Sequence, residues 1–185
     1  MPPRLADVRF YFDEDVLGLA KLVGGLRSEV TYPSDPGAEV HRRTRPACPI
    51  TVGSKDPEWI PVVARHGWLI VTRDSNIQRR RAEVAAVRDH GARMVAIAGS
   101  DARGTWEQLE VLMINWRRIE GWASQPGPFI YSVTRTGTPR AVPLVQLQRP
   151  RSAASTSPSA SWHRRDTAAS RFAVAALRAS ASSTG

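Results

Sequence analysis

Cysteine, histidine and lysine are all scarce in this 185-residue chain, and two of these scarcities exclude a class of site. The single cysteine, Cys48, allows neither an intramolecular disulfide nor a zinc site built from cysteines. The four histidines stand far apart, at positions 41, 66, 90 and 163, without the short spacing that is typical of a histidine metal site. No Ser/His/Asp or Cys/His arrangement indicates nucleophilic catalysis.

Long apolar runs are also lacking. No stretch approaches the roughly 18–20 apolar residues that a membrane-spanning helix requires. The first residues, "MPPRLADVRF", lack the apolar segment of a signal peptide. We therefore expect a cytoplasmic protein that has no membrane partner, with a length that suits one domain with a sizeable core.

The few lysines contrast with an abundance of arginine. Lys21 and Lys55 are the two lysines of a chain whose net charge is +9. A basic surface attracts polyanions, and the guanidinium group suits phosphate better than an ammonium group does. Charge alone therefore favours a nucleic-acid partner, although a basic surface that is merely solvated gives the same composition.

Strand and helix patterns alternate over the first 148 residues. Apolar runs predict strands at 8–12, 68–72, 93–98, 128–134 and 140–147, the last two as a hairpin with Pro143 at a sheet edge. Helical spacing predicts helices at 16–26, 57–66, 79–91 and 105–122. This order is typical of an α/β fold with a mostly parallel sheet and helices on both faces.

Two segments fall outside this alternation. Residues 30–55 are predicted to be a long connection, functional or mobile, with a short strand at "VTY". After residue 148 the chain becomes rich in Ser, Ala, Thr and Arg, so we expect a folded domain at 1–148 and a disordered tail at 149–185. In helix 105–122, one side is expected to carry Trp106, Leu109, Leu112, Met113 and Trp116.

Three acidic residues are placed to converge. Asp13 directly follows the first strand, Asp74 lies two residues past "WLIVT", and Asp56 opens the helix that leads into that strand. In a parallel sheet, these positions lie at the carboxyl edge of neighbouring strands, where sites form. Carboxylates gathered there would raise one another's pKa unless a hard divalent cation such as Mg²⁺ neutralised them. Such a cation can activate a water molecule to attack a phosphodiester bond.

Four acids in these segments also have a structural alternative. Asp15 is expected to cap the helix at Val16 or to lie next to the metal, and Glu14 to be solvated or to assist. Asp56 suits a helix cap, because Asp-Pro is a good helix start, and Asp74 suits a turn.

The arginines near these acids are candidates for substrate binding. Arg73 is adjacent to Asp74 and would either pair with an acid or contact the scissile phosphate. Arg79, Arg80 and Arg81 open a helix, where positive charge opposes the macrodipole, and this indicates phosphate binding. Trp59 and Trp68 are expected in the core rather than as platforms for bases.

The motifs "FYFDEDV" (10–16), "DPEW" (56–59) and "WLIVTRDSNI" (68–77), in this order and spacing, resemble the PIN-like nucleases, in particular their VapC-like toxin branch. The resemblance covers roughly residues 8–100. It implies a three-layer α/β/α sandwich and a metal-dependent ribonuclease, a toxin that a cognate antitoxin neutralises. Carried over by position, Asp13, Asp56 and Asp74 would be catalytic and would hold Mg²⁺ or Mn²⁺, with Glu14 or Asp15 as further ligands.

One position departs from the family pattern. Related sequences often carry a further acid two residues beyond the aspartate of "TRD", where this chain has Asn76, a residue that would contact substrate or a metal-bound water. The alternative is therefore a catalytically degenerate PIN-like module that binds RNA or protein. A DNA nuclease would share the metal chemistry. PIN-like proteins often form homodimers, and helix 105–122 has enough apolar surface either for such an interface or to cover the sheet.

Overall fold

The structure is a computed structural model that describes residues 3–73, 81–98 and 102–144. All of these belong to one compact unit, Met1–Leu147. The expected tail at 149–185 lies outside the described residues, so that domain division stays a prediction. No helix in the described ranges combines the length and the apolar character needed to cross a bilayer.

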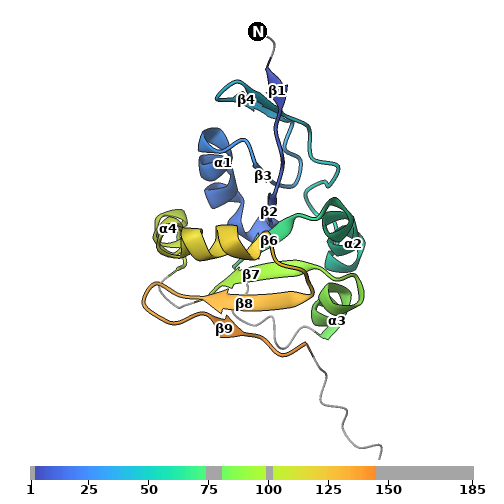
Figure 1. Ribbon diagram of the computed structural model, residues 1–185, viewed down its shortest axis with the longest axis vertical. Coiled ribbons are helices and arrows are strands. Elements are labelled where there is room, and N and C mark those ends of the chain that lie inside the picture. The colour runs from blue at the N-terminus through green and yellow to red at the C-terminus, as the bar shows by residue number, and fades with distance from the viewer. Residues whose placement is uncertain (1–2, 74–80, 99–101, 145–185) are drawn as a thin grey trace, which may run out of the picture. The chain divides into compact units, whose positions relative to one another are not determined.

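A six-stranded sheet forms the centre of this unit (Figure 1). Its order is β3 (Val30–Thr31), β2 (Phe10–Phe12), β6 (Leu69–Thr72), β7 (Arg93–Ile97), β8 (Phe129–Val133) and β9 (Arg140–Ala141). The first five strands run parallel, and β9 pairs with β8 antiparallel. The predicted mostly parallel sheet and the closing hairpin are confirmed, although the last strand is shorter than expected.

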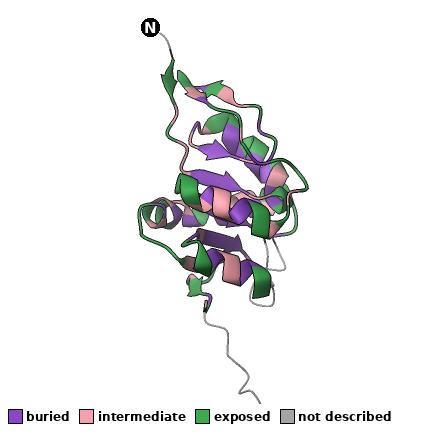
Figure 2. Cartoon of the chain, turned by 90° about the vertical axis from the view of Figure 1, so that its right-hand side faces the viewer, coloured by how far each residue is buried: buried purple, intermediate pink, exposed green. Residues whose placement is uncertain are grey.

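Helices cover both faces of this sheet. Helices α1 (Leu17–Leu26) and α4 (Thr105–Trp122) pack on one face, and α2 (Asp56–His66) and α3 (Arg81–Asp89) on the other. Side chains along β2 point alternately to the two faces of the sheet, so Phe10 and Phe12 enter one core and Tyr11 enters the other. Figure 2 shows the buried strands and the exposed outer faces of the helices. The predicted three-layer α/β/α sandwich is confirmed.

Residues 30–55 contain more structure than the predicted connection. Strands β4 (Ala38–Val40) and β5 (Arg43–Arg45) join β1 (Arg4–Leu5) in a second, three-stranded sheet of order β1-β5-β4. These strands are two or three residues long and carry charged side chains. The alternating apolar pattern that identifies a strand from sequence is therefore absent.

A buried ion pair fastens this small sheet to the main body. The side chains of Arg45 and Asp35 are 2% and 1% exposed, and Nε of Arg45 donates to Oδ2 of Asp35 at 2.7 Å. Asp35 also accepts from the Thr31 hydroxyl and from the backbone N–H of Gly37. A second nitrogen of Arg45, Nη1, donates to the carbonyl of Gly24 in α1 at 2.8 Å.

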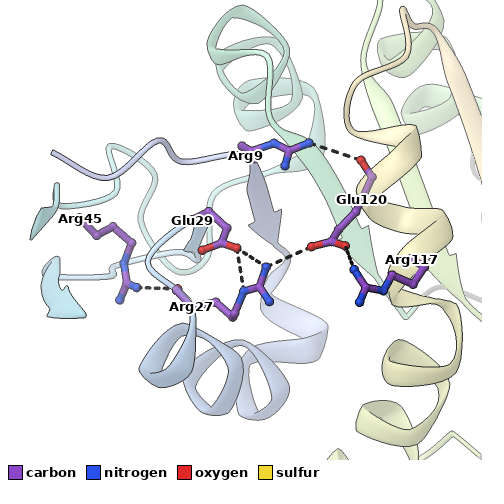
Figure 3. Close-up of polar contacts among 6 residues, drawn as sticks. All are labelled: Arg9, Arg27, Glu29, Arg45, Arg117 and Glu120. Atoms are coloured by element: carbon purple, nitrogen blue, oxygen red, sulfur yellow. Dashed lines mark hydrogen bonds and ion pairs between the residues drawn. The ribbon is translucent and has the colours of Figure 1, made fainter. Parts of the chain in front are cut away.

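A second polar network surrounds the C-terminal end of α4 (Figure 3). Arg27 donates to Glu29 at 2.7 Å and to Glu120 at 3.1 Å, while Arg9 donates to the backbone carbonyl of Glu120 at 3.3 Å. Arg117 lies 3.7 Å from the other carboxylate oxygen of Glu120. Cations suit this position because the last carbonyls of a helix carry partial negative charge.

The buried face of α4 agrees only in part with the predicted apolar side. Leu112 is buried as expected, but its buried neighbours are Gln108, Val111, Asn115 and Ile119. Trp106 and Met113, expected on that same side, are 67% and 63% exposed. Asn115 is tolerated in the core because its amide donates to the carbonyls of Val111 and Thr134.

Candidate active site

The carboxyl edge of β2 and β6 brings the first predicted acid into position. The two strands are parallel neighbours, with Phe12 opposite Val71. The ladder continues past β2, because the backbone N–H of Asp13 donates to the carbonyl of Val71 at 2.9 Å. The expected adjacency of these strands is therefore confirmed.

Asp13 and Asp15 lie side by side at this edge. The Thr72 hydroxyl, at the end of β6, is 3.3 Å from Oδ2 of Asp13 and 3.1 Å from Oδ2 of Asp15. The same Asp15 oxygen accepts the backbone N–H of Arg73 at 2.9 Å. A hydroxyl has one proton to donate, so Thr72 serves one carboxylate at a time.

The expected capping role of Asp15 is wrong. A 3₁₀ turn, Glu14–Val16, precedes α1, and its cap is Asp13, whose Oδ1 accepts the backbone N–H of Glu14 at 2.6 Å. Helix α1 starts at Leu17 with Val16 at the cap position and no side-chain cap bond. The extra turn rotates Asp15 toward β6 instead of toward the start of α1.

Electrostatics single out Asp13 among these acids. The pKa of Asp13 is raised from its ordinary value of 3.8 to about 7, and burial is the largest cause. The charge of Asp15 also contributes to this rise, and that of Asp56 does so to a smaller degree. Hydrogen bonds from the Glu14 N–H and the Thr72 hydroxyl oppose these effects. Asp13 therefore holds its proton close to neutral pH unless a cation approaches.

Glu14 and Asp56 come from different elements, and the charge of Asp56 acts on Asp13. The exposed Glu14 carboxylate accepts the backbone N–H of Gly53 at 2.8 Å, which ties the loop before α2 to the site. Oδ1 of Asp56 accepts the indole N–H of Trp59 at 3.1 Å. Asp56 is the first residue of α2 and not its cap, because Lys55, in extended backbone, takes the cap position.

Several predicted residues cannot be placed. Asp74, Asn76, Arg79 and Arg80 lie outside the described residues, and Arg81 is exposed at the start of α3. Within the described ranges, no three His, Cys, Asp or Glu side chains form a group that could hold a metal ion. A metal site at this edge would need another ligand, and Asp74 is the residue that the sequence predicts for it.

Arg73 joins the site to the loop before α4. Its backbone N–H binds Asp15, and its side-chain Nη1 donates to the carbonyl of Arg103 at 3.0 Å. Both arginines are exposed. Sequence reasoning missed Thr72 and Arg103. The position of Thr72 at the end of a buried strand was a usable signal, whereas Arg103 lies in a loop whose path no pattern indicates.

The raised pKa of Asp13 gives a prediction for the metal-free protein. The folded state favours protonated Asp13, so wild type loses stability as pH rises from about 4 to about 7. Asp13→Asn mimics the protonated form and should be more stable than wild type at pH 8 by about 2–4 kcal/mol. Thermal melts in EDTA between pH 5 and 8 measure this difference. A variant that gains nothing over wild type as pH rises would contradict the assignment.

Comparison with known proteins adds independent findings. Residues 8–99 match a family described as PIN like domain. Over 79 residues, the chain is 37% identical to a Mycobacterium tuberculosis protein named "Putative ribonuclease VapC45". That match covers 42% of this chain and 56% of the relative, so the chain matches just over half of that protein's length. No solved structure matches the chain.

Proposed function

The chain belongs to the PIN-like domain family through residues 8–99, and from this premise we propose that the protein is a metal-dependent endoribonuclease, the toxin of a toxin–antitoxin pair. The observation that carries the proposal is the pair Asp13 and Asp15 at the carboxyl edge of β2 and β6. The relative's name supports RNA as the substrate, and the resemblance to the VapC-like toxins supports an antitoxin as the protein partner. The net charge of +9 suits a polyanionic substrate.

The residues at this edge fit a hard divalent cation. Asp13 and Asp15 lie side by side and offer carboxylate oxygens, the ligands that Mg²⁺ and Mn²⁺ prefer. A buried carboxyl whose pKa is about 7 would release its proton when a cation binds. Asp74, predicted from the sequence, would complete the set, with Glu14 as a further candidate. When bound, the cation would lower the pKa of a water molecule and stabilise charge on the phosphodiester.

The side chains around the acids would prepare the site for RNA. The backbone N–H of Arg73 fixes Asp15, and the Thr72 hydroxyl holds the orientation of either carboxylate. Arg73 would draw the phosphate backbone toward the acids, with Arg81 farther along the chain. Arg79, Arg80 and Asn76 remain proposed substrate contacts on the sequence argument alone.

A groove between α1 and α4 is the proposed docking surface for the protein partner. Its volume is about 170 Å³, and it is lined by Val23, Leu26, Arg27, Leu109, Leu112, Met113 and Trp116. Leu26 is 63% exposed, as is Met113, and exposed apolar side chains of this size are typical of protein interfaces. An antitoxin or a second copy of this chain would bury them.

The test is cleavage of a panel of single-stranded and structured RNAs with Mg²⁺, with Mn²⁺ and with EDTA. We expect cleavage with either cation and intact RNA in EDTA. Folded protein that leaves every RNA intact under all three conditions would contradict the proposal and favour the degenerate binding module.

A further inference from the structure

We propose that Arg103 and Trp106, in the loop and first turn that begin α4, bind an unpaired RNA strand beside the acids. Arg103 would bind a phosphate and Trp106 would stack with a base. The inference rests on the proposed function and deepens it, because it assigns two further substrate-binding residues of this chain. Neither residue is among those expected from the sequence to bind substrate.

The start of α4 is physically joined to the acidic edge. Arg73 bridges the two, because its backbone N–H binds Asp15 at 2.9 Å while its side chain donates to the carbonyl of Arg103 at 3.0 Å. The start of α4 also lies against α1, because a Cβ added to Gly18 would lie 2.5 Å from Oγ1 of Thr105. The absence of a side chain at Gly18 thus lets α4 begin directly against the start of α1.

Trp106 is much more exposed than the two tryptophans that were expected in the core. It is 67% exposed, whereas Trp59 and Trp68 are 3% and 8% exposed. Its indole N–H donates to Oε1 of Glu110 at 3.2 Å, which orients the ring along the helix surface. An oriented, solvent-exposed indole is a platform on which any base can stack.

Arg103 has the charge that a phosphate requires. It is exposed, and its guanidinium makes no hydrogen bond or ion pair that involves the described part of the chain. The carbonyl of the same residue is held by Arg73, so the backbone is fixed while the side chain reaches into solvent. A fixed backbone with an unengaged cation can bind phosphate without breaking an existing ion pair.

Within the described part of the chain, the acids near the start of α4 face other groups. The Glu107 carboxylate turns back toward Gly104, where it meets the start of its own helix. Glu110 binds Trp106 and lies 2.7 Å from Arg135, which follows β8. Arg73, Arg103 and Arg135 therefore follow the neighbouring strands β6, β7 and β8 along the edge that begins at Asp13.

This combination favours an unpaired strand over a duplex or a protein. In a duplex, the bases are stacked on one another and their faces cannot reach an indole. An apolar protein surface would use Trp106 but would leave Arg103 without a partner. A single strand uses both groups, and its backbone can pass from Arg103 across Arg73 to the acids.

The experiment measures binding of a fluorescent single-stranded RNA and of its duplex by polarisation. The buffer contains Ca²⁺ in place of Mg²⁺, and the recovered RNA is checked to be intact. Trp106→Ala should weaken single-strand binding about tenfold, as expected for the loss of one stacked base. Trp106→Phe should restore most of it. Arg103→Gln should lower the slope of log K against log[salt] by about one. The duplex should bind weakly and respond little to any variant.

Ile114→Ala is the matched control, because Ile114 is 55% exposed farther along the same helix and does not line the proposed docking groove. It should leave RNA binding within about twofold of wild type, and thermal melts should show that every variant is folded. Equal losses for Ile114→Ala and Trp106→Ala would overturn the inference, as would unchanged binding by both Trp106→Ala and Arg103→Gln. A Trp106→Ala protein that binds RNA normally but changes its oligomeric state on gel filtration would make Trp106 a protein interface.

Failure of the proposed function and failure of this binding site give different results. Wild type that binds the single strand through Trp106 and Arg103, yet never cleaves RNA with Mg²⁺ or Mn²⁺, would keep this binding site and reject the ribonuclease. Wild type that cleaves RNA while both variants bind and cleave normally would keep the ribonuclease and reject this site.

Discussion

Replacing Asp13 with asparagine should lower the rate of RNA cleavage by at least about 10²-fold. Removal of one group that acts electrostatically on the reaction in a shielded site typically costs this much. The substitution keeps the size of the side chain, and its amide can still pair with Thr72. Because the variant should be more stable than wild type at neutral pH, an unfolded protein would not explain the loss. Initial rates with Mg²⁺ on an RNA that wild type cuts measure the effect.

Asp7→Asn is the matched control for this loss. It removes the same charge from an exposed position that precedes β2, at the opposite end of the strand from Asp13. We expect its rate to stay within about twofold of wild type. Equal rates for Asp13→Asn and wild type would show that the acidic edge takes no part in cleavage.

Replacing Arg45 with methionine should lower the free energy of unfolding by about 3–5 kcal/mol. The substitution leaves Asp35 buried without its cation, and an uncompensated buried charge is strongly destabilising. It also removes the donor to the carbonyl of Gly24, which anchors the small sheet to α1. Chemical denaturation, followed by tryptophan fluorescence, measures the change.

Arg43→Met tests whether burial is the cause. Arg43 lies on the same strand, β5, but is exposed, so its loss should change stability by less than about 0.5 kcal/mol. The double variant Asp35→Asn/Arg45→Met should recover part of the loss, because it removes the buried charge together with its partner. Equal losses of unfolding free energy in Arg45→Met and Arg43→Met would mean that the buried ion pair does not stabilise the fold.

The elements with strong apolar periodicity were predictable from the sequence. Helix α4 spans Thr105–Trp122 as predicted, and the runs around β2, β6 and β7 fall on the expected strands. The position of Asp13 followed from the same pattern, because the end of a buried parallel strand lies at a fixed edge of the sheet. Predicting this part of the site therefore required only the order of the strands along the chain.

Other features depend on tertiary contacts that leave no local pattern. The strands β1, β4 and β5 are short and polar, and the Arg45–Asp35 pair that anchors them joins residues that are ten positions apart. The face that α4 buries matches the predicted apolar side only in part, because Gln108 and Asn115 are polar yet buried. Asp15 turns toward β6 because of a 3₁₀ turn whose length the sequence does not reveal.

Arg103 illustrates the same limit for the site itself. It acquires its position only because Arg73 reaches across from the end of β6 to its carbonyl, a contact between residues 30 positions apart. In the sequence, it is one arginine among many in a strongly basic chain.

The most direct test of the central claim is Mn²⁺ binding, measured by calorimetry on wild type, Asp13→Asn and Asp7→Asn at pH 7.5. The account predicts that wild type and Asp7→Asn bind Mn²⁺ with similar affinity and that Asp13→Asn binds at least about tenfold more weakly. Wild type that binds no Mn²⁺, or an Asp13→Asn protein that binds it as wild type does, would contradict a metal-dependent site at the carboxyl edge of β2 and β6.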